Sequence, residues 1–95
     1  MKWRLFVVPK VQASLRNYSP ETKRYIRQGF DEICRDPWIG KPLRDKLEGF
    51  HSFRARRFRI VYQIQRNIIA VIVVAVGPRE TVYEQLAEEI HPIVE

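Results

Sequence analysis

The sequence is poor in cysteine, with one residue, Cys34, in 95. A single thiol excludes an internal disulfide and any metal site built from several cysteines. Cys34 occupies an apolar position of a predicted helix, so we expect a buried core residue and not a nucleophile. One unpaired cysteine is compatible with the reducing cytoplasm.

Long apolar runs are also absent. The longest, residues 68–76, has the length of a strand and falls short of the roughly 18 residues of a membrane span. Residues 5–8 are too short for the apolar region of a signal peptide, and no cleavage pattern follows them. The chain has no repeat or low-complexity segment. We therefore expect one soluble cytoplasmic domain over residues 1–95, with no membrane partner.

Acidic residues are fewer than basic ones: 11 Asp and Glu against 17 Lys and Arg, a net charge of +6. Such a balance attracts polyanions, namely nucleic acid, a membrane surface or an acidic protein. The composition, 45% hydrophobic and 29% charged, is typical of a globular domain. Because the arginines cluster on one predicted sheet, a functional surface is favoured over a merely soluble basic domain.

Hydrophobic periodicity predicts an α+β fold. Ser19-Pro20 is a helix-start signal, and Gly29 in the apolar stripe of that helix would allow close packing. The last three strands are joined by tight turns, so we expect a small antiparallel sheet of about four strands. Two N-terminal helices should pack on one face, leaving the arginine face more open, and a C-terminal helix follows. In chain order the expected elements are strand 2–8, helix 10–18, helix 20–35, strands 50–56, 58–64 and 68–76, and helix 79–90.

Basic side chains share one face of this sheet. Strand 50–56 places His51 on the inward face, and Arg54 and Arg56 on the other. Strand 58–64 places Arg59 and Gln63 on that same outer face. The guanidinium fork matches phosphate oxygens two at a time, so the pattern predicts a phosphate-binding surface.

The last predicted helix adds two polar residues. Arg79 and Tyr83 are four residues apart and should face the same way. These groups suit cleavage of RNA without a metal, in which the 2′-OH attacks the adjacent phosphorus. Such a site needs a base, cations around the charged phosphorane and an acid for the leaving oxygen. Arginines meet the second need, and His51 and Tyr83 are the nearest candidates for the base.

Some of these residues also have a structural interpretation. Arg57 lies at the bend between two strands and fits a solvated turn. His51, on the inward alternation, fits a packed or rim histidine. For Arg54, Arg59 and Arg79 we favour function over solvated surface.

A longer pattern runs from residue 43 to residue 83: LR, LEGF, FR, FRIVYQI and VGPRETVY. It resembles the RelE/ParE toxin superfamily of prokaryotic toxin–antitoxin pairs. The resemblance implies a small antiparallel sheet with two N-terminal helices. RelE-like members are ribosome-dependent endoribonucleases, or mRNA interferases, that cut mRNA in the decoding site and leave a 2′,3′-cyclic phosphate. No metal or cofactor is expected.

The resemblance also implies roles for single residues. Arg59 matches the strand arginine taken to stabilise the transition state. Arg79 matches an arginine near the leaving group, and Tyr83 a tyrosine that stacks on or orients the substrate. Arg54 falls where RelE-like enzymes carry a basic strand residue. Further RNA contacts are expected from Arg56, Arg57 and Gln63.

This chain departs from the family at the general base. Ser52 and Arg54 occupy the stretch where well-known members carry a lysine pair. The Glu-and-His pair of another branch is not evident either, since Lys41 lies before the leucine of the pattern and Tyr83 stands near the place of the histidine. His51 is then the candidate base.

The resemblance implies partners and leaves alternatives. A cognate antitoxin, acidic and partly disordered, would neutralise the protein by wrapping it, and operator DNA would be reached only through that complex. The targets would be mRNA and the ribosome. One alternative is a ParE-like toxin that inhibits DNA gyrase without nuclease activity. Another is a toxin-like module that engages only antitoxin and operator DNA.

Overall fold

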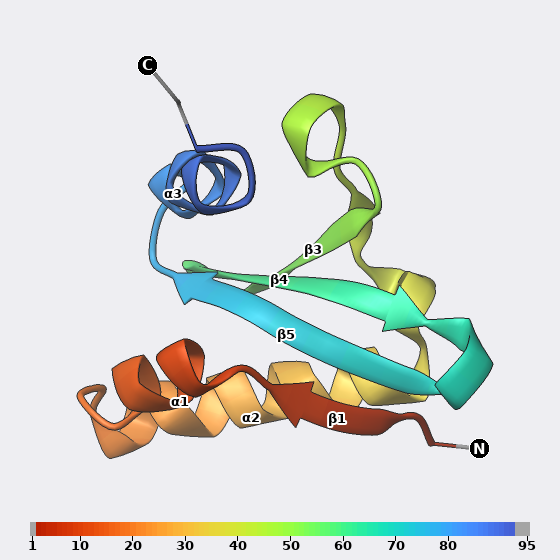
Figure 1. The fold of residues 1–95 in the computed structure, drawn as a ribbon. Helices are drawn as coiled ribbons and strands as arrows, with labels where there is room; N and C mark the ends of the chain where they lie inside the picture. The colour runs from red at the N-terminus through yellow and green to blue at the C-terminus, as the bar shows by residue number, and fades with distance from the viewer. Residues whose placement is uncertain (1, 93–95) are drawn as a thin grey trace.

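The computed structural model of the protein describes residues 2–92 and has three layers, with helices on both faces of a sheet (Figure 1). Helices α1 (Pro9–Leu15) and α2 (Pro20–Arg35) cover one face, and α3 (Thr81–Ile90) covers part of the other. The strands are β1 (Arg4–Val7), β2 (Lys41–Pro42), β3 (Phe50–Ala55), β4 (Phe58–Gln65) and β5 (Ala70–Gly77). Short 3-10 turns occupy Pro37–Ile39, Asp45–Leu47 and Arg66–Ile68.

The sheet confirms the α+β class but differs in detail from the antiparallel sheet of about four strands. It has five strands in the order β1-β5-β4-β3-β2, and β1 runs parallel to β5. Helices α1 and α2, between β1 and β3, carry the chain back along the sheet. The edge strand β1 can therefore run in the same direction as its partner β5. β2 has two residues, Lys41 and Pro42, too few to show alternation. A proline is tolerated there because β2 is an edge strand.

Helix α2 begins and packs as its sequence predicts. The Ser19 Oγ accepts a hydrogen bond from the Thr22 N–H at 3.2 Å, and Pro20 follows in the first turn. A Cβ on Gly29 would lie 2.8 Å from Ile60 Cδ1, so the glycine allows the close approach of helix to sheet. Cys34 is buried on this helix, as expected, and burial raises the pKa of its thiol.

Each face of the sheet carries its own core. The core under α1 and α2 consists of Val11, Ile26, Phe30, Ile33, Ala55, Phe58, Ile60, Tyr62, Val71 and Val73. The core under α3 consists of Leu47, Phe50, Val61, Ala75, Val82 and Leu86. The two N-terminal helices therefore pack on one face, as expected, and α3 covers part of the other face, which carries the arginines. Because β5 is apolar on both faces, the apolar line of α3 packs on the second one.

None of the helices within residues 2–92 combines the length and the apolar character of a membrane span.

Candidate functional site

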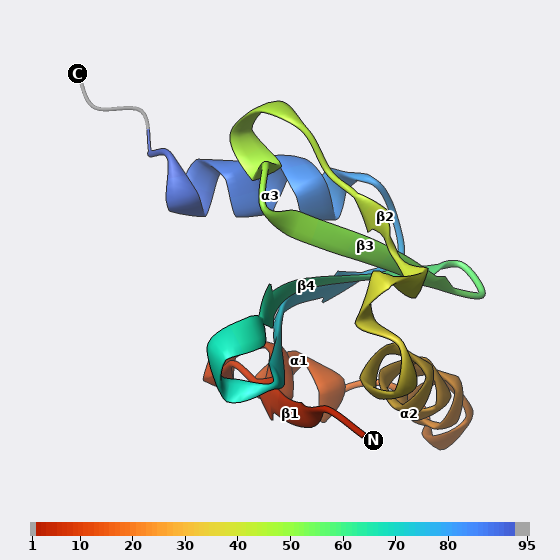
Figure 2. The same cartoon turned by 90° about the vertical axis from the view of Figure 1, so that its right-hand side faces the viewer.

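A cleft of about 290 Å³ opens on the α3 side of the sheet, where β2, β3 and β4 meet the start of α3. In Figure 2, β2 and β3 lie on the same side of the molecule as α3. The side chains that line the cleft are Lys41, Leu43, Ser52, Arg54, Arg59, Glu80 and Tyr83. Residues from β2, from the β3–β4 hairpin and from the start of α3 therefore contribute to one site that has more basic than acidic side chains.

Two arginines lie directly opposite each other in this cleft. Arg54 on β3 is the register partner of Arg59 on β4. Like charges placed opposite one another destabilise a sheet, and an anion bound between them would relieve that repulsion. Arg54 Nε donates a hydrogen bond of 2.8 Å to the Arg56 carbonyl oxygen, which leaves its other nitrogens available. The pair is thus suited to hold a phosphate group.

Arg59 also has an acidic neighbour. Its Nη2 lies 3.6 Å from Glu80 Oε1. The Arg59 side chain is 18% exposed, whereas the Glu80 side chain is 77% exposed. The Arg59 guanidinium is therefore largely buried against the sheet, and the Glu80 carboxylate lies at the solvent-exposed side of the cleft.

Tyr83 is fixed at the cleft by Ser52. The two hydroxyl oxygens are 2.7 Å apart, and Ser52 is buried on β3. This contact joins the first turn of α3 to the sheet. The aromatic ring is thereby placed beside the arginine pair, where it can stack on a nucleotide base.

Of the predicted catalytic residues, the cleft brings together Arg54, Arg59 and Tyr83 but not His51. His51 lies on the opposite face of the sheet, where its ring stacks on Tyr62 with centroids 5.7 Å apart. Its Nδ1 is buried without a hydrogen-bond partner, and burial lowers the pKa of the imidazole. Strand alternation explains this placement, because neighbouring residues point to opposite faces. His51 is therefore separated from the cleft by the sheet.

Arg79 does not line the cleft either, and the reasoning that placed it in a helix with Tyr83 is wrong. Helix α3 begins at Thr81, and Arg79 is an exposed residue of the turn before it. Its carbonyl oxygen accepts from the Val82 N–H at 3.1 Å. This turn connects the end of β5 at Gly77 to the start of α3 at Thr81. Glu80, next to it, faces the cleft instead.

The three predicted RNA contacts lie outside the cleft. Arg56 has a positive φ of 57°, and its guanidinium reaches over the Tyr25 ring of α2, 4.8 Å from the centroid. The expectation that Arg56 shares the face of Arg54 is therefore wrong, since the turn redirects its side chain. Arg57 is exposed in the same turn. Gln63 lies on the expected face of β4, four residues beyond Arg59.

Sequence reasoning missed Lys41 and Glu80 as members of the site. Lys41 is brought opposite Ser52 by the short strand β2. No pattern could locate a strand of two residues before its partner was known. No sequence pattern distinguishes Glu80 from Glu84, Glu88 and Glu89, and the turn before α3 places it at the cleft.

The model of a known family matches residues 9–83; its description is ParE toxin of type II toxin–antitoxin system, parDE. The chain belongs to this toxin family. Among curated relatives of this toxin, Toxin RelG of Mycobacterium tuberculosis is 33% identical over 61 residues, covering 63% of this chain and 70% of RelG. Toxin RelE of the same organism is 36% identical over 55 residues, covering 57% of each chain. The match thus spans just over half the length of RelE.

A solved structure shows the same fold. The toxin–antitoxin complex RelBE2 of Mycobacterium tuberculosis contains a chain that superimposes on this toxin with a TM-score of 0.77 at 25% identity. The match covers 83% of this chain and all of that one, 100%. These likenesses confirm the RelE/ParE superfamily and the α+β fold.

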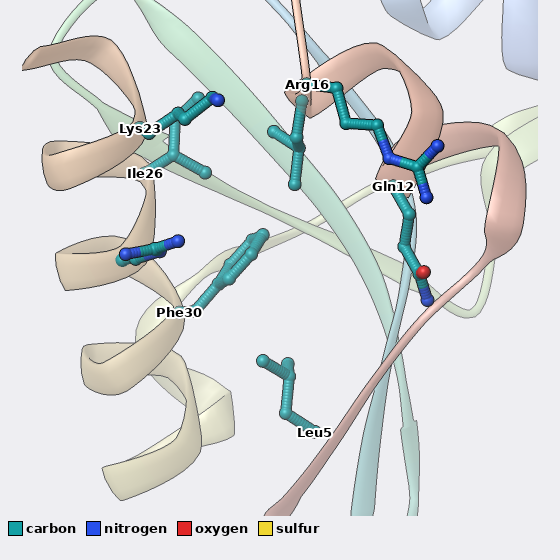
Figure 3. A pocket seen from close by; sticks show the side chains of 8 residues that line it. Leu5, Gln12, Arg16, Lys23, Ile26 and Phe30 are labelled. Carbon is teal, nitrogen blue, oxygen red and sulfur yellow. The ribbon is translucent and has the colours of Figure 1, made fainter. Parts of the chain in front are cut away.

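The toxin has a second, larger depression on the other side of the sheet, a groove of about 460 Å³ between β1, α1 and α2 (Figure 3). Apolar side chains, among them Phe30 from α2 and Leu5 from β1, form its floor. Its basic rim consists of Arg16, Lys23 and Arg27. The groove therefore combines apolar surface with positive charge, unlike the polar cleft.

Proposed function

We propose that this toxin is a metal-independent endoribonuclease that cleaves mRNA on the ribosome. The observation that carries the proposal is the cross-strand pair of Arg54 and Arg59 in the cleft, with the Tyr83 ring beside it. A phosphodiester held between two guanidinium groups is oriented for attack by the 2′-hydroxyl of the ribose on its 3′-oxygen side. The same charges stabilise the phosphorane better than the ground state, which is the requirement for catalysis.

Residues around the cleft fit a larger RNA footprint. Arg79 is exposed and adjoins Glu80 of the cleft, so it borders the path of a bound strand. Arg57 is exposed at the β3–β4 turn, beyond the Arg54 end of the cleft, whereas the Arg56 guanidinium lies over Tyr25 of α2. Such side chains contribute affinity through phosphate contacts and carry no sequence information. The net charge of +6 favours binding to ribosomal RNA.

Primer extension on a defined mRNA, with and without ribosomes, tests the proposal. We expect cuts within codons, dependent on ribosomes, with a 2′,3′-cyclic phosphate at the new end. Arg59→Ala should abolish the cuts. Arg24→Ala, an exposed arginine on α2 outside the cleft, is the matched control and should cut like wild type. A folded, growth-inhibiting protein that makes no cuts under either condition would refute the nuclease function.

The second part of the proposal is a cognate antitoxin that binds the groove of Figure 3. RelBE2 is by its name a toxin–antitoxin complex. An acidic amphipathic segment would place apolar side chains on the groove floor and carboxylates against the basic rim. Operator DNA would be reached only through that complex.

Titration calorimetry with the antitoxin tests the groove. The double variant Lys23→Glu, Arg27→Glu reverses charge at the rim and should weaken binding at least tenfold. Arg24→Glu changes the same helix outside the groove and should bind like wild type. Equal affinity for all three proteins would place the antitoxin elsewhere.

A second candidate function is inhibition of DNA gyrase, which the match to the ParE family model favours. A DNA-cleavage assay with purified gyrase separates the two functions. Gyrase-dependent DNA breaks without RNA cuts would establish the alternative.

A further inference from the structure

One carboxylate lines the cleft among the residues that the structure describes, and it belongs to Glu80. Glu80 stands at the N-cap of α3, where a side-chain oxygen can accept a hydrogen bond from the first helical N–H groups. Here the side chain makes no such bond. Helix capping therefore does not explain its position. It is directed to Arg59 instead, with 3.6 Å between Oε1 and Nη2.

The other polar groups of the cleft are poor proton acceptors. Protonated lysine and arginine side chains carry donors only, which excludes Lys41, Arg54 and Arg59. The hydroxyls of Ser52 and Tyr83 are engaged with each other at 2.7 Å. A carboxylate, in contrast, is ionised at neutral pH and only accepts.

We infer that Glu80 is the general base of the cleft and accepts the proton of the attacking 2′-hydroxyl. The inference rests on the proposed nuclease function. As the 2′-O–H proton passes to the Glu80 carboxylate, the 2′-oxygen forms a bond to phosphorus. The P–O5′ bond breaks, and the leaving 5′-oxygen takes a proton from water. Glu80 then returns its proton to solvent, so protons and charge balance.

The contact with Arg59 gives this step its geometry. The 2′-oxygen and the phosphorus that it attacks are neighbours in the RNA chain. An acceptor beside the guanidinium that holds the phosphate therefore comes within hydrogen-bonding reach of the 2′-hydroxyl. Because Glu80 is 77% exposed, its side chain can turn from Arg59 to the substrate without disturbing the core.

Single-turnover cleavage of ribosome-bound mRNA, followed from about pH 4.5 to pH 9, tests the inference. The proteins are wild type, Glu80→Gln, Glu80→Asp and the control Glu84→Gln, whose side chain is exposed on α3 outside the cleft. We expect Glu80→Gln to be slower by about 10²–10⁴-fold and to lose the acidic limb of the wild-type pH profile. Glu80→Asp should keep the limb at a reduced rate, and Glu84→Gln should match wild type.

Two further measurements separate a base from other roles. Glu80→Gln should bind mRNA carrying a 2′-deoxy nucleotide at the cut at least as tightly as wild type. The substitution keeps the size of the side chain and removes a negative charge that repels the RNA phosphates. A substrate with sulfur in place of the leaving 5′-oxygen does not need a protonated leaving group. Glu80→Gln should remain slow on it.

Each contrary outcome has a definite meaning. If wild type cleaves and Glu80→Gln cleaves equally well with the same pH profile, the base assignment is wrong and the nuclease function stands. Restoration by the sulfur substrate would make Glu80 the acid and overturn the inference. Faster cleavage and tighter binding by Glu80→Gln would make Glu80 a competitor of the substrate phosphate, which also overturns it. No cleavage by wild type would refute both proposals.

Discussion

The Ser52 Oγ on β3 and the Tyr83 Oη on α3 are hydrogen-bonded at 2.7 Å. This contact spans 31 residues of sequence and joins the C-terminal helix to the sheet at the edge of the cleft. It orients an aromatic ring beside Arg54 and Arg59, and so makes the position of Tyr83 depend on a residue of another element.

Tyr83→Phe removes this hydrogen bond and keeps the ring. We expect a loss of about 0.5–1.5 kcal/mol in the free energy of unfolding, measured by urea denaturation. Cleavage should fall only slightly, because stacking uses the ring. Tyr83→Ala should reduce cleavage much further. Equal activity of the two variants would show that the ring does not contact the substrate.

Arg59→Ala and Arg79→Ala should both relieve growth arrest while the protein stays folded. We expect a loss of about 10²–10³-fold in cleavage for Arg59→Ala, because a preorganised donor at the phosphorane is lost. Arg79→Ala should cost less, since Arg79 lies in the turn outside the cleft lining. Arg24→Ala, at an exposed position of α2 outside the cleft, is the control for general loss of charge. Circular dichroism verifies folding, and an equal effect of all three substitutions would contradict a site centred on Arg59.

Tyr62→Phe should destabilise the fold by about 1–3 kcal/mol. The buried Tyr62 hydroxyl donates to the Pro37 carbonyl at 2.6 Å and accepts from the Gly40 N–H at 3.1 Å. Burial, the largest cause, raises the pKa of this phenol to about 12. In Tyr62→Phe the buried Pro37 carbonyl and the buried Gly40 N–H would each lose their hydrogen-bond partner. Urea denaturation measures the loss, and Tyr25→Phe, with a long 3.4 Å contact, is the matched control and should be nearly neutral.

His51 should make stability depend on pH. Burial lowers its pKa from 6.5, so the unfolded chain binds a proton more readily than the native state. The free energy of unfolding should therefore be full above about pH 6.5 and decline as the pH falls through that value toward the native pKa. Urea denaturation at about pH 7.5 and pH 5.5 measures the decline. In His51→Asn the free energy of unfolding should decline less between these two pH values. The same decline in the variant and in wild type would contradict the assignment to His51.

The sequence predicted the elements well where periodicity and local signals agree. Ser19-Pro20 begins α2, and Gly29 allows its packing on Ile60. The alternation in β4 places Arg59 on its observed face. The missed strand β2 and the parallel pairing of β1 carry no local signal, because pairing partners come from distant segments.

By itself the sequence determined the class of fold, the family and the presence of Arg54, Arg59 and Tyr83 near one another. Those conclusions follow from period, charge and motif order, which are local properties of a chain. Only the tertiary structure decided which other side chains join them at the site. Strand alternation, a redirecting turn and the docking of α3 moved His51, Arg56 and Arg79 out of the cleft and brought Lys41 and Glu80 into it. The positions of Lys41 and Glu80 depend on contacts between distant segments, so no local pattern specifies them.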